Sequence, residues 1–125
     1  MKQASPSALE RATVDAALRG ELARWQVIDT HLERCYQTGG WRASLMIANA
    51  IGHLAEVAWH HPELLLAYGS VTVRLQTHET GAITRRDLAL ARRIEALICW
   101  QPNEADDDLT GLPDEPSARY LISEL

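Results

Sequence analysis

The sequence predicts an α+β domain in which pairs of sequential strands form one sheet and the helices gather on one of its faces. Three segments carry apolar residues at helical spacing, near residues 7–22, 41–59 and 84–98. Two pairs of short segments rich in apolar and β-branched residues lie between them, and turn signals separate the members of each pair. The predicted order is therefore helix, two strands, helix, two strands, helix.

The first helix is expected at about Ser7–Leu22. Ser5-Pro6 and Ser7-x-x-Glu10 are helix-start signals. Proline is favoured in the first turn of a helix. In a capping box, the serine side chain accepts from the backbone N–H three residues later, and the glutamate there accepts from the backbone N–H of the serine. Gly20 is expected to end or interrupt this helix. Apolar residues recur along it at Leu9, Val14, Ala17 and Leu18.

Two short strands are expected next, one around Trp25 and Val27 and one over residues 31–38, with Asp29-Thr30 as the turn between them. Gly39-Gly40 then breaks the chain. Residues 41–59 are predicted to form the central helix. This segment is apolar nearly all round, so we expect the helix to be largely buried.

Pro62 stops the central helix, and strands are predicted at residues 64–68 and 71–77, joined by Gly69-Ser70. The second of these strands alternates apolar and polar residues, which indicates one buried face formed by Val71, Val73 and Leu75. Thr84-x-x-Asp87 is expected to open the last helix as a cap and third-position acid. The periodic face of that helix consists of Leu88, Ala91, Ile94, Glu95 and Ile98.

We expect residues 1–100 to form one domain and residues 101–125 to form an acidic C-terminal extension. The extension holds seven acidic residues and one basic residue, a net charge of −6, whereas the first hundred residues hold eleven bases and ten acids. Neither part has the basic surface that nucleic acid requires. Residues 103–116 are expected to be loop or disordered. The apolar segment Arg119–Ile122 is expected either to dock, on its own sheet edge or on a neighbouring subunit, or to fray.

Composition places the protein among ordinary globular proteins, with 46% hydrophobic and 23% charged residues. No apolar run approaches the ~20 residues that span a bilayer, and Met1–Ala8 lacks the apolar core of a secretory signal. The spacing of Cys35 and Cys99 suggests neither a metal site nor a redox pair. We therefore expect a cytoplasmic protein with two reduced cysteines and no membrane partner.

Histidines and carboxylates stand at the ends of the predicted elements between residues 56 and 87. Glu56 lies one helical turn before His60, His60-His61 ends the central helix, His78 follows a strand, and Asp87 lies in the first turn of the last helix. Functional sites are usually built where the ends of helices and strands meet around one cleft. Each residue also has a purely structural interpretation, as a helix-end cation, a surface histidine or a capping acid.

A metal site is a weaker interpretation of the same residues. His53, Glu56 and His60 stand at positions i, i+3 and i+7, but an adjacent histidine pair is not standard ligand spacing and no H-E-x-x-H motif is present. Arg85-Arg86 and Arg92-Arg93 are interpreted as a solvated helix face.

The full pattern is Glu56-x3-His60-His61-Pro62-x5-Tyr68-x9-His78-x8-Asp87. It resembles the signature of the pterin-4a-carbinolamine (4a-hydroxytetrahydrobiopterin) dehydratases at every anchored position and spacing, and a weaker resemblance runs from about Trp25 to Leu97. The resemblance implies a four-stranded antiparallel sheet with three helices on one face. It also implies homodimers or homotetramers, a pterin as substrate, and neither metal nor cofactor.

The resemblance implies roles for the signature residues. We expect His60 and His78 to be the acid–base pair of the dehydration and His61 to orient the pterin, with all three imidazoles lining one cleft. Glu56 would stand near the wall of the cleft and either hold a histidine tautomer or raise the pKa of that histidine, and Asp87 would anchor the last helix. Pro62 and Tyr68 complete the supporting set, and the spacing leaves open which histidine is the acid.

Departures from the family pattern bear on the pocket more than on the fold. Leu64-Leu65-Leu66-Ala67 stands where the family often has an aromatic-rich run, the chain has no phenylalanine, and Ala82-Ile83 replaces the usual Gly-Leu. The acidic tail, with Trp100 and Arg119-Tyr120, looks like the tails of a carboxysome-associated branch whose members are RuBisCO assembly factors. The alternative to a dehydratase is therefore a catalytically inactive assembly factor of the alpha-carboxysome with RuBisCO as partner.

Overall fold

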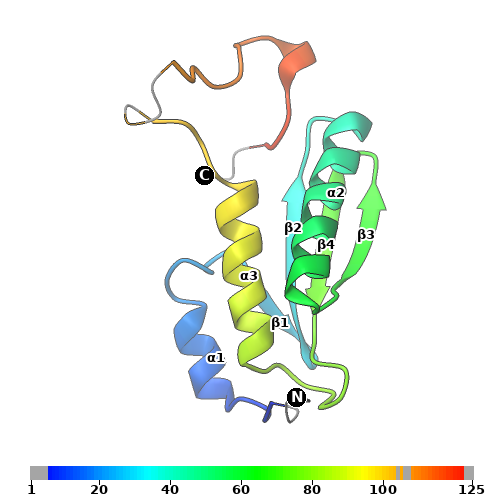
Figure 1. The fold of residues 1–125 in the computed structure, drawn as a ribbon, viewed down its shortest axis with the longest axis vertical. Helices are drawn as coiled ribbons and strands as arrows, with labels where there is room; N and C mark the ends of the chain where they lie inside the picture. Colours follow the sequence, from blue (N-terminus) through cyan, green and yellow to red (C-terminus); the bar gives the residue numbers. More distant parts are fainter. Residues whose placement is uncertain (1–5, 104, 106–107, 123–125) are drawn as a thin grey trace.

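The computed structural model describes residues 6–103, 105 and 108–122. Three helices lie on one side of a four-stranded sheet (Figure 1), as the sequence predicts. The helices are α1 (Arg11–Ala17), α2 (Trp41–Ala58) and α3 (Arg85–Ile98). The strands are β1 (Gln26–Ile28), β2 (His31–Gln37), β3 (Glu63–Ala67) and β4 (Ser70–Leu75).

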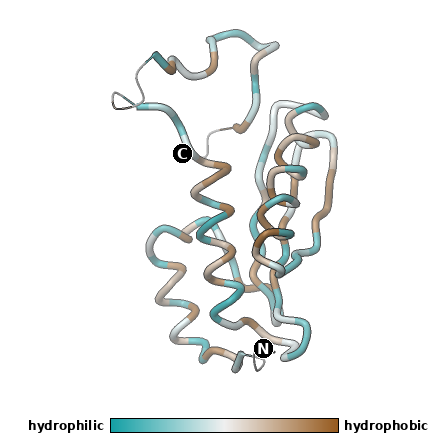
Figure 2. Tube along the Cα trace, viewed as in Figure 1, coloured by the Kyte–Doolittle hydropathy of each residue, from teal (hydrophilic) through white to brown (hydrophobic). Residues whose placement is uncertain are grey.

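All neighbouring strands of the sheet are antiparallel, in the order β1-β2-β4-β3. The predicted alternation along β4 is confirmed, because Val71, Val73 and Leu75 are fully buried against the helices while Arg74 is exposed on the opposite face. Apolar residues recur along the helices and the strands beside them (Figure 2). The sheet therefore has one face packed on the core and one open face.

The first helix is shorter than predicted. It begins after Glu10 and ends at Ala17, and the chain continues through turns that include Gly20. Leu22 and Trp25 remain buried in this irregular stretch. Of the apolar positions predicted for this helix, Val14 is buried and Leu9, Ala17 and Leu18 are partly buried, and the helix ends before it reaches Gly20.

The expectation that α2 is largely buried is wrong. Its buried residues are small or lie on one stripe: Ala43, Ser44, Ile47, Ile51 and Ala55. Trp41, Met46 and Val57 are exposed, Val57 to 73%. The helices form a single layer, so nothing among the described residues covers the outward side of α2. None of the described helices is long and apolar enough to cross a membrane.

The C-terminal segment docks on the sheet of its own chain, one of the outcomes expected from the sequence. Leu121 forms an antiparallel bridge with Thr38, the Gly39 N–H donates to the Tyr120 carbonyl (2.7 Å), and the Ile122 N–H donates to the Gln37 carbonyl (2.9 Å). The bridge lies beyond the three-residue ladder that β1 forms with β2. Before it, among the described residues after α3, the only helical turn is the 3-10 turn Pro116–Ala118.

A polar cluster lies between α3 and the sheet, around the carboxylate of Glu95. That carboxylate accepts hydrogen bonds from Trp25 Nε1 (2.9 Å), Tyr36 OH (2.8 Å), Arg34 Nε (3.0 Å) and Cys99 Sγ (3.1 Å). Burial raises the pKa of Glu95, but the hydrogen bonds from Arg34, Cys99 and Tyr36 outweigh it, so the pKa is lowered overall. Burial raises the pKa of the Cys99 thiol to about 11, and this cysteine is free and un-ionised near neutral pH.

Candidate active site

The site begins where α2 ends, at Trp59. This residue takes the left-handed conformation (φ 52°, ψ 46°) that usually belongs to glycine at a helix end. The turn is closed by a hydrogen bond from the His60 N–H to the Ala55 carbonyl (3.1 Å). A bulky residue in this conformation costs about 1–2 kcal/mol. The turn sends the two following histidines in different directions.

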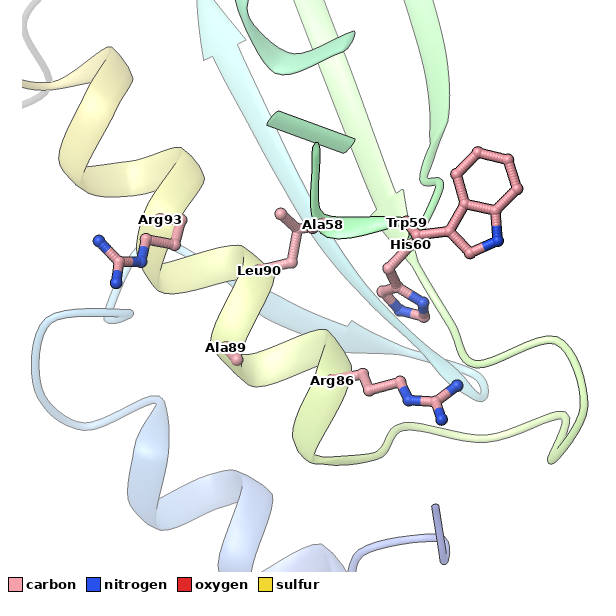
Figure 3. Close-up of a pocket in the computed structure, with 7 residues that line it drawn as sticks. All are labelled: Ala58, Trp59, His60, Arg86, Ala89, Leu90 and Arg93. Carbon is pink, nitrogen blue, oxygen red and sulfur yellow. The ribbon is translucent and has the colours of Figure 1, made fainter. Parts of the chain in front are cut away.

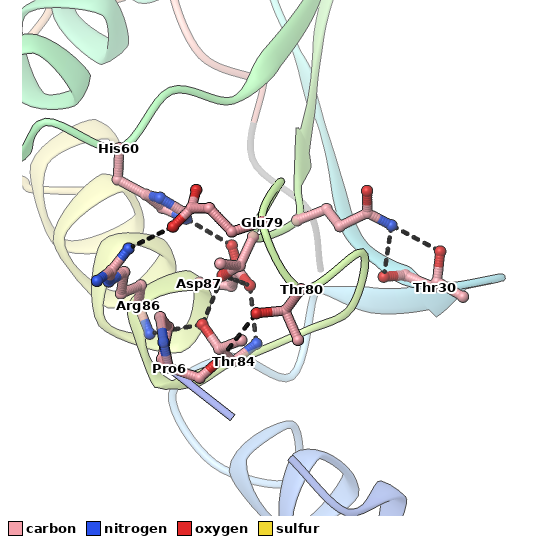
Figure 4. A network of polar contacts seen from close by, with 10 residues as sticks. Pro6, Thr30, His60, Glu79, Thr80, Thr84, Arg86 and Asp87 are labelled. Atoms are coloured by element: carbon pink, nitrogen blue, oxygen red, sulfur yellow. Dashed lines mark hydrogen bonds and ion pairs between the residues drawn. The ribbon is translucent and has the colours of Figure 1, made fainter. Parts of the chain in front are cut away.

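His60 turns toward the start of α3. Its Nε2 lies 2.6 Å from Oδ1 of Asp87, a carboxylate that is fully buried (Figure 4). The other oxygen of Asp87 accepts from the Thr77 hydroxyl (2.9 Å) and from the Thr84 N–H (2.8 Å). The predicted capping box is thus confirmed. One carboxylate both caps α3 and orients the His60 ring.

His61 turns to the other side and is held by Glu56. Its Nε2 lies 2.8 Å from Oε1 of Glu56, and the edge of its ring packs on Trp59, with the ring centroids 5.0 Å apart. Glu56 therefore holds one histidine of the pair and Asp87 holds the other. If each imidazole donates through Nε2, as a carboxylate partner requires, its Nδ1 is left as the acceptor.

A hollow of about 410 Å³ opens where the end of α2 and the end of β4 meet the open face of the sheet. It is lined by His31, His61, Glu63, Arg74, Gln76 and His78, and we call it the histidine hollow. The imidazole of His78 forms no hydrogen bond with any described residue. Two of the three expected histidines thus share one hollow, and the third imidazole there belongs to His31.

A second hollow of about 430 Å³ lies between the end of α2 and α3, and His60 lines it (Figure 3). Arg86 and Arg93 project from α3 beside it, while the indole of Trp59 points away from α3. The expectation that all three imidazoles line one cleft is therefore wrong for His60, which lines the second hollow. The cause is the buried carboxylate of Asp87, which draws the His60 ring toward α3.

The structure does not bring Tyr68 to the site. His61 precedes β3 and Tyr68 follows it, so the five-residue strand, about 3.3 Å per residue, separates them. Tyr68 is 73% exposed, and its hydroxyl lies beside Gly40 at the start of α2. Pro62 is half-buried between His61 and β3. Within the described residues, no group of three or more His, Cys, Asp or Glu side chains is arranged to hold a metal ion.

Sequence reasoning missed His31, Glu63, Arg74 and Gln76 as lining residues. The available signal was alternation, since His31 and Glu33 share one set of positions on β2, and Gln76, just after β4, continues the set of Arg74. Only the pairing of the strands brings these two sets to the same end of the open face.

The fold and the site define a small α+β domain with carboxylate-held histidines at the ends of its elements. The chain belongs to the pterin 4 alpha carbinolamine dehydratase family, whose model matches residues 7–97. A relative from Thermomicrobium roseum, provisionally named a pterin-4-alpha-carbinolamine dehydratase, is 39% identical over 89 residues, which are 71% of this chain and 95% of the relative. One of the same provisional name from Aquifex aeolicus is 39% identical over 77 residues, 62% and 78% of the two chains.

Solved structures agree with the fold. The crystal structure of a transcriptional coactivator/pterin dehydratase from Brucella melitensis superposes with a TM-score of 0.67 at 29% identity, over 72% of this chain and 97% of the other. A pterin dehydratase-like protein described as a RuBisCO assembly factor in the alpha-carboxysome has a TM-score of 0.51 at 20% identity, over 62% and 90% of the two chains. At this identity the second likeness concerns the fold alone.

Proposed function

We propose that this protein dehydrates 4a-hydroxytetrahydropterins to quinonoid dihydropterins. The observation that carries the proposal is that His61 and His78 face one hollow of about 410 Å³, with His61 held by a carboxylate. Membership of the family supports the substrate class.

The reaction needs one acid and one base. The C4a–O bond breaks, the hydroxyl leaves with an added proton as water, the proton on N5 is removed, and a C4a=N5 double bond forms. No oxidation state changes overall, so the pterin is the substrate and the step requires no redox cofactor. Imidazole suits both proton transfers, since its unperturbed pKa of ~6.5 lies near the working pH.

The geometry favours His61 and His78 as the pair that contacts the reacting ring. Glu56 accepts from Nε2 of His61, which leaves Nδ1 of His61 as the base for the N5 proton. His78, which no described residue binds, then delivers the proton to the departing hydroxyl. His60 was expected to act with His78, and we now assign it a positioning role, because it lines the other hollow, beside α3.

Substitution of each histidine tests this assignment. His61→Ala and His78→Ala should each lower kcat/KM at least ~100-fold, the usual effect of removing a general acid or base. His53→Ala, an exposed change on α2 that touches neither hollow, is the control and should leave kcat/KM unchanged. His60→Ala should cost less than His61→Ala. A larger loss for His60→Ala in a folded protein would return the acid–base role to His60 and His78.

A second candidate function is RuBisCO assembly without catalysis, and the extension favours it. The tail and the end of α3 enclose a hollow of about 560 Å³ whose apolar lining includes Leu97, Trp100 and Leu112. Such apolar surface suits a protein partner. Binding of RuBisCO subunits by the full chain, lost on truncation after Trp100, would support this function, and a wild-type protein without dehydration above the uncatalysed rate would leave it as the better candidate.

We also propose that the protein forms a homodimer or homotetramer. β3 is a free edge of the sheet among the described strands, and Leu65 on it is 60% exposed. Light scattering of the full chain tests this, and a monomer at micromolar concentration would contradict it.

A further inference from the structure

Three charged side chains stand side by side across the open face of the sheet, next to the histidine hollow. Arg74 on β4 pairs in register with Glu33 on β2 and with Glu63 on β3. Directly opposed residues on neighbouring antiparallel strands have Cβ atoms about 5 Å apart. In the register of the sheet Arg74 therefore stands between two glutamates, and both Arg74 and Glu63 line the hollow.

The two carboxylates are used differently. Glu33 accepts from Nε of Arg74 at 2.8 Å and also lies 3.5 Å from Nε2 of His31. Glu63 forms no hydrogen bond or ion pair with any described residue, although it is the register partner of Arg74. The bond to Glu33 fixes the guanidinium through Nε and leaves its two terminal nitrogens without a partner among the described residues.

This arrangement places fixed donors beside a free acceptor. Gln76, the polar residue just after β4, already donates through its amide nitrogen to the hydroxyl (2.6 Å) and the carbonyl (3.1 Å) of Thr30. The groups left for a ligand are thus the terminal nitrogens of Arg74 and the carboxylate of Glu63. Such charge-assisted bonds are stronger than neutral ones and can be bidentate.

A 2-amino-4-oxopyrimidine ring has the complementary edge. Its C4 oxygen accepts hydrogen bonds, and its N3–H and 2-amino group donate in parallel, as an amidine does to a carboxylate. We propose that Arg74 and Glu63 recognise this edge of the substrate, Arg74 at the C4 oxygen and Glu63 at N3–H and the 2-amino group. The inference rests on the proposed function for its substrate, and it assigns to Arg74 and Glu63 the choice of a 2-amino over a 2-oxo ring.

A purely structural role for these residues makes a different prediction. Exposed cross-strand ion pairs contribute little to stability, so removing one would leave the fold and ligand affinity nearly unchanged. Recognition instead predicts a large change in KM and in ligand affinity with a small change in kcat, because these groups bind the edge of the ring remote from the reacting carbon.

The experiment measures kcat and KM for dehydration and, separately, the Kd of an unreactive 7,8-dihydropterin by fluorescence titration. Glu63→Gln and Arg74→Gln should raise KM and Kd about 10- to 100-fold, with kcat within about threefold of wild type. Arg92→Gln is the matched control, since Arg92 is also an exposed arginine paired with one glutamate, Glu21, at 2.9 Å. It should leave both constants unchanged.

A ligand with oxygen in place of the 2-amino group sharpens the test. Wild-type protein should bind this dihydrolumazine at least tenfold more weakly than the dihydropterin, and Glu63→Gln should abolish the difference, because an amide can donate to the C2 oxygen. Dehydration with unchanged KM and Kd in both Glu63→Gln and Arg74→Gln would overturn the inference but leave the proposed function intact. If the protein binds dihydropterin more tightly than dihydrolumazine but does not catalyse dehydration, the inference stands and the proposed function is removed.

Discussion

The two carboxylates that hold the histidine pair differ in burial, and this separates their contributions to stability and activity. Asp87 is fully buried and caps α3, whereas the side chain of Glu56 is 68% exposed. Asp87→Asn should lower the free energy of unfolding by about 1–3 kcal/mol, because it disturbs a cap and a buried hydrogen-bond network. Glu56→Gln should leave stability unchanged and lower kcat roughly tenfold, because His61 loses its fixed tautomer. Chemical denaturation and steady-state kinetics on both variants check this, and equal stability losses would contradict it.

Glu95 is the carboxylate at the centre of the polar cluster between α3 and the sheet. Glu95→Gln leaves Arg34, which is 5% exposed, without its carboxylate, and should lower the free energy of unfolding by about 2–3 kcal/mol. The control is Glu21→Gln, an exposed partner of Arg92, with an expected change within about 0.5 kcal/mol. Urea unfolding at pH 7 measures both values, and a Glu95→Gln variant as stable as Glu21→Gln would show that the cluster contributes little.

The lowered pKa of Glu95 predicts how the stability of the fold depends on pH. Because the pKa of Glu95 is lowered in the folded state, its stabilising contribution is present above the pKa of an unfolded glutamate, ~4.3, and is lost as pH falls through the folded value. The stability difference between wild type and Glu95→Gln should therefore be largest near pH 7 and shrink below about pH 4. A difference that grows on acidification would contradict this sign.

At the scale of elements, the sequence predicted what depends on local pattern. The helix and strand order, the buried face of β4 and the cap of α3 all follow from spacing and capping chemistry within a few residues. The burial of α2 could not be predicted, because an apolar helix surface does not reveal how many layers cover it. The neighbours of Arg74 were hidden as well, since Glu33 lies 41 positions away and only the strand register brings the two together.

The contact between the tail and β2 depends on one glycine. A Cβ on Gly39 would lie 2.5 Å from Cβ of Arg119 and 2.7 Å from its carbonyl carbon, closer than atoms can approach. Gly39→Ala should therefore displace Arg119–Ile122 from the sheet and speed hydrogen exchange at the Ile122 amide at least tenfold. Gly20→Ala, where a Cβ would meet nothing within 4 Å, is the control. Unchanged exchange in Gly39→Ala would show that the contact does not form in solution.

For the whole molecule, a single helix layer leaves one sheet face open, and the histidine hollow lies at one end of that face. The expectation that His61 and His78 share one cleft agrees with the structure, because the motif spacing already places them after α2 and after β4. His60 was placed in the same cleft because all three histidines stand at the ends of predicted elements. The left-handed turn at Trp59 and the buried carboxylate of Asp87 direct His60 elsewhere, and both effects depend on tertiary structure.

The position of a bound pterin shows which histidines contact the substrate. A crystal structure of the protein with 7,8-dihydropterin should show the bicyclic ring in the histidine hollow, with ring atoms within about 3 Å of an imidazole nitrogen of His61 and of His78. A ring bound instead between His60 and Arg86 on the α3 side would contradict the account.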